Sequence, residues 1–187
     1  MIDTISRKFH SWTTGWRVLF LLVANMVMLG YIEPVSSAIL ELVANNSVLP
    51  LDVMFFYSPA QAFAMIEKYT QAGRIFYMKI ELTMDILYPV IYALFLSLAI
   101  TWLFQRSFQP ENSMQKWNVA PVGAWFFDLL ENVGIVTMLA VHPHQPTWVA
   151  WLAMLFGLLK WGFVLLSIGL VLVGLVLAAL NRFRKQE

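Results

Sequence analysis

The sequence predicts an all-α integral membrane protein built as a four-helix bundle. Hydrophobic residues make up 60% of the 187 residues and charged residues only 12%, about half the charged fraction of an average soluble domain. The apolar residues gather in long runs, and a run of roughly 20 residues is enough for a helix to cross a bilayer. Four such runs occur, at about 16–32, 82–104, 119–141 and 149–180. We expect them to form a single domain.

Composition also excludes several classes of function. The chain has no cysteine, so it forms no disulfide and has no thiol nucleophile or thiolate metal site. Its formal net charge of +1 gives no sign of nucleic-acid binding, and no glycine-rich nucleotide-binding loop is present.

The first predicted span follows a short polar lead, residues 1–15, and has tryptophans at its start that suit a membrane interface. Asn25 is its only polar residue near mid-span. Glu33-Pro34 should end or kink the helix, because proline cannot continue the backbone hydrogen bonds. A cleavable signal peptide, cut near residues 36–38, is the competing interpretation.

Residues 33–79 form the long outer segment between the first two spans. Ser58-Pro59-Ala60-Gln61 has the pattern of a helix start, with an N-cap serine, a first-turn proline and a capping-box glutamine. We expect a short amphipathic helix over 59–71. Its apolar face should consist of Ala62, Phe63, Ile66 and Tyr69.

The second span carries a stripe of polar and hydroxylated side chains. Steps of three and four residues place them on one helix face. Pro89 should break one backbone bond there and bend the helix. The stripe consists of Arg74, Tyr77, Glu81, Asp85, Tyr88 and Tyr92.

The third span contains Asp128, Glu131 and Asn132 on one helix face, and the fourth contains a single charge, Lys160. Each charge near the bilayer centre costs roughly 2.5–3.5 kcal/mol on insertion scales, so these side chains should face protein or water. Counted from the outer ends of their helices, Glu131 lies ~15 Å deep and Lys160 ~17 Å deep. Lys160 should therefore pair with Glu131 or Asp128.

Together these residues predict a polar cavity at mid-depth that opens outward. Its charges do not balance, because Asp85, Asp128 and Glu131 face only Lys160. Either at least one carboxyl is protonated at neutral pH or a cation occupies the site. The simpler alternative is that the Glu131–Lys160 pair only fixes how the helices pack.

Three motifs resemble a family of small, uncharacterised bacterial four-span membrane proteins. They are Gly73-Arg74-x-x-Tyr77, Asp85-x-x-Tyr88-Pro89 and Phe127-Asp128-x-x-Glu131-Asn132-x-x-Ile135, followed by Lys160. The similarity covers roughly residues 57–160. It implies the same four-helix architecture and brings no activity with it.

The distribution of Lys and Arg predicts the orientation. With four spans, eight basic residues lie on the side of the termini and three on the other, which favours cytoplasmic termini. We expect a bacterial inner membrane protein.

Three classes of function fit these residues. The first is an intramembrane acid/base enzyme acting on a lipid or isoprenoid-like substrate, with Asp85, Asp128, Glu131 and Lys160 as catalytic residues. The substrate-binding residues would be Asn25, Arg74, Glu81, Tyr88, Tyr92 and Asn132. A divalent cation held by the carboxylates is a variant of this function.

The second class is a cation- or proton-binding or transport protein, because intramembrane carboxylates mark ion pathways. The third is a non-catalytic subunit. The expected partners are membrane lipid and either a second copy of the chain or another membrane protein.

Overall fold

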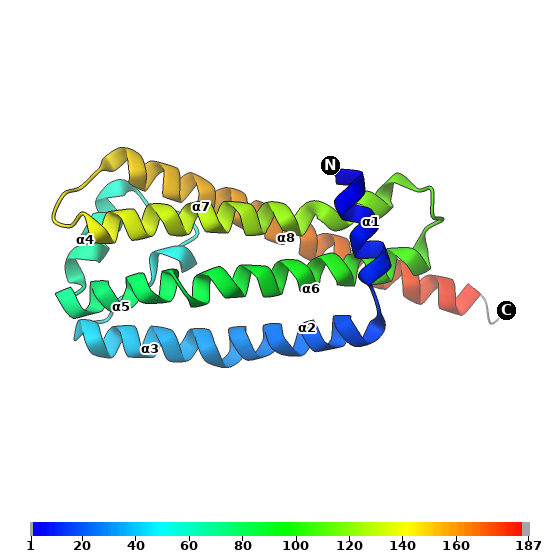
Figure 1. Ribbon diagram of the computed structural model, residues 1–187, viewed down its shortest axis with the longest axis horizontal. Helices are drawn as coiled ribbons and strands as arrows, with labels where there is room; N and C mark the ends of the chain where they lie inside the picture. The colour runs from blue at the N-terminus through cyan, green and yellow to red at the C-terminus, as the bar shows by residue number, and fades with distance from the viewer. Residues whose placement is uncertain (1, 185–187) are drawn as a thin grey trace.

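The structure, a computed structural model, describes residues 2–184, with side chains described to residue 182. All regular structure in this range is helical, which confirms the predicted fold class. Four helices are long and apolar enough to cross a membrane, and they lie side by side (Figure 1). They comprise Gly15–Ala44, Gln71–Ser107, Ser113–Ala140 and Thr147–Arg182.

The first helix, residues 2–12, and the last described turns of the fourth span lie at one end of the bundle, which we call the α1 end; the opposite end is the α4 end (Figure 1). The sequence predicts only a polar lead here, but α1 (Ile2–Trp12) is an amphipathic helix with Ser6 and Phe9 buried. Lys116 Nζ lies 2.7 Å from Asp3 Oδ1 and ties α1 to the bundle. The hydrogen bond and positive charge of Lys116 hold the pKa of Asp3 below its ordinary value.

The first span is longer than predicted. It runs from α2 (Gly15–Val27) through a π-helical turn, η1 (Met28–Ile32), into α3 (Glu33–Ala44). Pro34 therefore does not end the helix. The wider π turn, in which the Glu33 N–H donates to the Met28 carbonyl, accommodates a proline that cannot form the regular bond.

The second span is interrupted before its proline. It consists of α5 (Gln71–Glu81) and α6 (Met84–Ser107), separated by a turn in which the Thr83 N–H donates to the Ile80 carbonyl at 3.0 Å. Asp85 therefore lies in the first turn of α6, directly after the interruption.

The predicted amphipathic helix is α4 (Pro59–Lys68). Ser58 and Gln61 form the expected capping box, which confirms that prediction. The helix ends three residues earlier than predicted because Thr70 already caps α5, accepting from the Gly73 N–H at 3.0 Å. The predicted apolar face is buried: Ala62, Phe63, Ile66 and Tyr69.

The third and fourth spans consist of η3 (Ser113–Val119), α7 (Ala120–Ala140) and α8 (Thr147–Arg184). The six residues between α7 and α8 form a tight connector, so the two helices run antiparallel, and α8 packs along both α6 and α7. This packing brings the polar residues of three spans together.

The segment between α3 and α4 turns back into the bundle instead of lying on its surface. Its short helix η2 (Leu51–Val53) contacts α7. Leu51 is fully buried, and its N–H donates to Tyr77 Oη at 2.7 Å. The Tyr69 hydroxyl fixes the same segment by donating to the Leu49 carbonyl at 2.8 Å. Irregular backbone inside a membrane bundle is tolerated where protein covers it in this way.

Candidate functional site

Lys160 is the centre of the buried polar residues. Its Nζ lies 2.6 Å from Glu131 Oε2 and 3.7 Å from Asp128 Oδ1, which confirms the predicted pairing. It also donates to the Asp52 carbonyl at 3.2 Å. Glu131 is completely buried and Lys160 is 7% exposed. Neither Glu131 oxygen has a directional hydrogen bond within residues 2–184, so the ion pair balances its charge.

Gly157 makes room for the Glu131 carboxylate against α8. A Cβ atom at this position would lie 2.5 Å from Glu131 Oε1, closer than atoms in contact can approach. Gly157 precedes Lys160 by three residues, so both lie on the face of α8 that meets α7. A glycine one turn from the lysine is therefore part of how the pair forms.

Asp128 is held by a different partner. The Tyr92 hydroxyl donates to Asp128 Oδ2 at 2.8 Å, and the Tyr88 ring packs edge-on against Tyr92 with centroids 5.4 Å apart. The two carboxyls around Lys160 thus have unlike surroundings: Glu131 has the close ion pair alone, whereas Asp128 has a hydroxyl donor and a longer contact with the lysine.

Asn132 joins the site to the proline of α6. Its Nδ2 donates to the Asp85 carbonyl at 2.6 Å. Asp85 lies four residues before Pro89, whose missing N–H would otherwise have bonded to this carbonyl. Two of the three motifs therefore meet through one hydrogen bond.

Asp52 is a site residue that the sequence-based prediction missed. The Tyr77 hydroxyl donates to Asp52 Oδ1 at 2.7 Å, while the Asp52 carbonyl accepts from Lys160. The available signals were the lone acid within residues 45–66 and the polar stripe that contains Tyr77. Neither signal shows that the loop enters the bundle.

A small polar pocket lies beside this loop. Its volume of about 10 Å³ is close to the minimum for one water molecule, so it is much smaller than a cavity for a lipid headgroup. Asp85 is 8% exposed, and its carboxylate makes no hydrogen bond or ion pair with the described part of the chain. The polar residues lining the pocket are Glu33, Ser36, Ser37, Asp52, Tyr77 and Asp85.

Glu81 is the least compensated acid of the site. It is 0% exposed, and neither carboxyl oxygen has a hydrogen-bond partner among the residues described. It follows Tyr77 by one turn on the same face of α5. A carboxyl buried in this way requires either a proton or a counterion.

Two predicted site residues lie apart from the Lys160 group. Arg74 donates from Nη1 to the Tyr69 carbonyl at 2.6 Å, so it supports the start of α5. Asn25 is half-buried on α2, and its Oδ1 has no hydrogen-bond partner in residues 2–184.

Within the described range, no three His, Cys, Asp or Glu side chains are grouped so as to hold a metal ion. His142, at the α4 end, instead lies 3.0 Å from Glu67 Oε2. The predicted divalent cation thus stays a prediction.

No protein-family model, curated protein or solved structure matches this chain. Conclusions about function therefore rest on the residues of the site.

Proposed function

We propose that this integral membrane protein binds and exchanges protons at its buried carboxyl groups, within the cation- or proton-handling class. The observation that carries the proposal is Glu81, a fully buried carboxyl with no partner in the described chain. Intramembrane carboxyls of this kind commonly form proton relays.

Charge balance supports protons as the counterions. Lys160 is already engaged by Glu131 and Asp128. Two further buried acids, Glu81 and Asp85, have no Lys or Arg within ion-pair distance in the part of the chain that is described. Burying an uncompensated ion costs several kcal/mol, so protons would neutralise this surplus.

The size of the polar pocket favours a proton over a lipid substrate. The pocket beside Asp52 and Asp85 has room for about one water molecule. Water there can deliver a proton to the Asp85 carboxyl without any opening of the bundle. A lipid headgroup could bind there only if the loop that contains Asp52 moved out of the bundle.

Buried polar groups continue from the site toward the α1 end, which supports a route across the protein. Beyond Tyr92, α6 carries Ser97 and Thr101, both fully buried. Asn118 Nδ2 donates to Thr101 Oγ1 at 2.9 Å and to the Ser6 carbonyl at 3.4 Å. Hydroxyl and amide groups of this kind can carry hydrogen-bonded water.

An acid/base enzyme is the second candidate. It is favoured by the unlike surroundings of Asp128 and Glu131 around one lysine, because carboxyls in unlike environments can divide the roles of acid and base. In this function Lys160 would keep one carboxylate ionised. An apolar substrate retained in the purified protein would support it.

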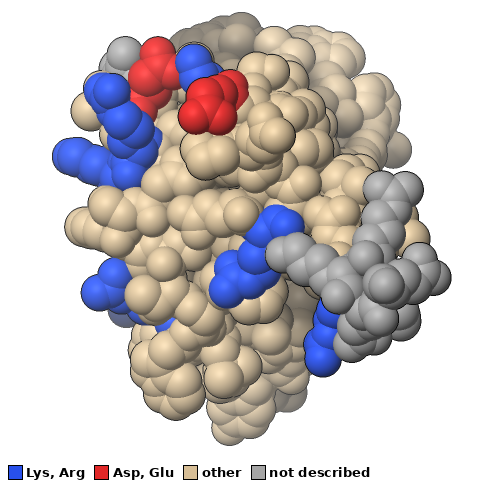
Figure 2. All heavy atoms as spheres, turned by 90° about the vertical axis from the view of Figure 1, so that its right-hand side faces the viewer, with Lys and Arg blue, Asp and Glu red and all other residues tan. Residues whose placement is uncertain are grey.

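The distribution of basic residues supports an inner-membrane location with the α1 end in the cytoplasm. Figure 2 shows Lys and Arg side chains gathered on that end, with few acids among them. Basic residues near the ends of spans favour the cytoplasmic side. The exposed basic residues here are Arg7, Lys8, Arg17, Arg106, Lys116 and Arg182; Lys68, Arg74 and Lys79 lie toward the α4 end.

Proton flux into liposomes tests the proposal. The protein would be reconstituted with a pH-sensitive dye inside the liposomes, and a pH gradient applied. We expect flux above that of empty liposomes, and a loss of this flux in Glu81→Gln. Glu41→Gln, which changes an exposed acid on α3, is the matched control. Wild-type flux no faster than that of empty liposomes would contradict transport.

A further inference from the structure

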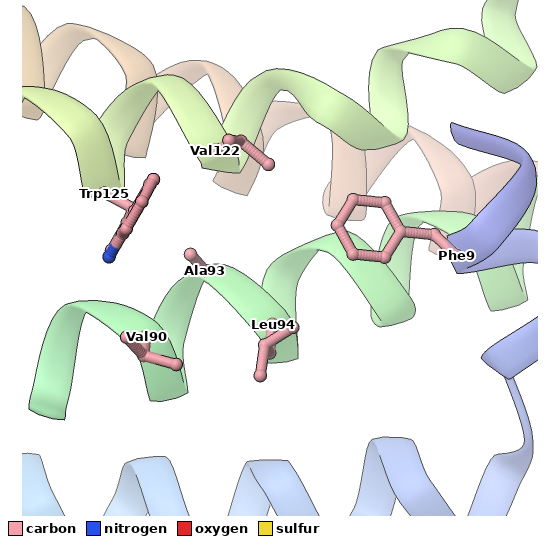
Figure 3. Close-up of a pocket in the computed structure, with 6 residues that line it drawn as sticks. All are labelled: Phe9, Val90, Ala93, Leu94, Val122 and Trp125. Carbon is pink, nitrogen blue, oxygen red and sulfur yellow. The ribbon is translucent and has the colours of Figure 1, made fainter. Parts of the chain in front are cut away.

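An apolar groove lies between α6 and α7, away from the polar site (Figure 3). Its volume is about 190 Å³, larger than the ~150 Å³ apolar cavity that binds benzene in a well-studied protein. The Phe9 ring of α1 closes one end, and the Trp125 ring stands across the other (Figure 3). The lining residues are Phe9, Val90, Ala93, Leu94, Val122 and Trp125.

The groove exists because the residue at its base, Ala93, has a small side chain. Ala93 lies between the longer side chains of Val90 and Leu94 on one wall and Val122 on the other (Figure 3). A larger residue at position 93 would fill the space between the helices. Val90 and Leu94 lie on the opposite side of α6 from Tyr88 and Tyr92, while Ala93 and Trp125 pack in the same apolar cluster as these tyrosines.

The chemistry of the lining selects the occupant. Water is disfavoured, because the only hydrogen-bonding side-chain group among the lining residues is the unpaired Nε1 of Trp125, whereas a buried water needs two to four polar partners. The groove lies between two helices that are long and apolar enough to cross a membrane, so hydrocarbon is the medium next to it. An empty groove would also forfeit the dispersion contacts of its walls.

We propose that the groove between α6 and α7 is a binding site for a hydrocarbon chain of a membrane lipid, bounded by Phe9 and Trp125. The occupant is a chain segment held in one place, unlike the exchanging lipid around the rest of the bundle. This site is independent of the proton proposal, since none of its lining residues is titratable.

Photocrosslinking tests this site directly. The protein would be reconstituted in phosphatidylcholine bilayers that contain a phosphatidylcholine with a diazirine on one acyl chain. After irradiation, peptide mass spectrometry would locate the adducts. We expect them to concentrate on residues 90–94 and 122–125, compared with residues 172–176 of α8, where Leu172 and Val176 are exposed.

Filling the groove provides the decisive comparison. Ala93→Phe should lower the adducts on the groove segments about five-fold or more, equivalent to losing roughly 1 kcal/mol of binding. Gly162→Phe on α8, where a Cβ meets no atom within 4 Å, should leave them unchanged. If Ala93→Phe does not fold, Val122→Phe fills the same space from the other wall, and the same fall in adducts is then expected of this variant.

Two results would overturn the inference. One is an equal adduct yield on the groove and on residues 172–176, which means ordinary surrounding lipid. The other is a crosslink between two copies of the chain through the groove segments, which means a protein occupant.

Discussion

Asn132 donates to the backbone carbonyl of Asp85 at 2.6 Å, the carbonyl that Pro89 leaves without its helical partner. A side chain of α7 thereby satisfies a backbone group of α6 inside the bundle. The bond joins the interrupted second span to the helix that carries Asp128 and Glu131. It gives a structural reason for both the proline and the asparagine.

Asn132→Ala should lower the free energy of unfolding by about 1–3 kcal/mol, the cost of a buried polar group without a partner. Pro89→Ala restores an N–H that can donate to Asp85, so Asn132→Ala should cost less in that background. Unfolding in detergent measures the four proteins of this cycle. Equal costs in both backgrounds would show that the two residues are not coupled.

Removing one member of the central ion pair should lower the stability of the protein more than removing both. Lys160→Met leaves the buried Glu131 without its partner and should cost about 3–5 kcal/mol, and Glu131→Gln leaves Lys160 only its longer contact with Asp128, whereas the double variant leaves no charge of the pair behind. Thermal unfolding of the three variants gives the comparison. Simple additivity of the single effects is the result that would rule out direct coupling.

Gly157→Ala should destabilise the protein by about 1–3 kcal/mol, because the added methyl group would overlap the Glu131 carboxylate. Gly162→Ala is the matched control on the same helix, five residues away and with open space around its Cβ position. The control should leave stability unchanged or raise it, since alanine favours helix. A similar loss in both variants would mean that the effect is not specific to Glu131.

The pairing of Lys160 with Glu131 could be predicted from the sequence because depth can be counted along helices. α7 ends and α8 begins at the same short connector, and each residue adds a rise of ~1.5 Å along either helix. Equal counts from the connector therefore give equal depths. The capping box at Ser58 was predictable for a similar reason, since it depends only on local spacing.

Asp52 could not be placed by the same reasoning. Irregular backbone has no fixed rise, so the sequence does not show how far the loop enters the bundle. Glu33 was assigned to the outer segment because Pro34 normally ends a helix. A π turn accommodates that proline and keeps Glu33 within the first span. For these two reasons the sequence-based prediction did not include Asp52 and Glu33, two acids that line the polar pocket.

Cysteine labelling should place Ser113 on the cytoplasmic side, and Ser47 and Gln145 outside. The chain has no cysteine, so each single-cysteine variant reports on one position, and all three positions are exposed. Ser6 lies on the buried face of α1 and is a poor labelling site, while Gln186 lies outside the described residues. Labelling of Ser113 from outside would reverse the proposed orientation.

The most direct test of the proton account is infrared spectroscopy of the protein in lipid nanodiscs at neutral pH. Protonated carboxyls absorb separately from carboxylates, and their band persists when the group is buried. We predict a protonated-carboxyl band at neutral pH that becomes smaller in Glu81→Gln and is unchanged in Glu41→Gln. A spectrum with no protonated carboxyl at neutral pH would contradict the claim that protons neutralise the surplus acids of this site.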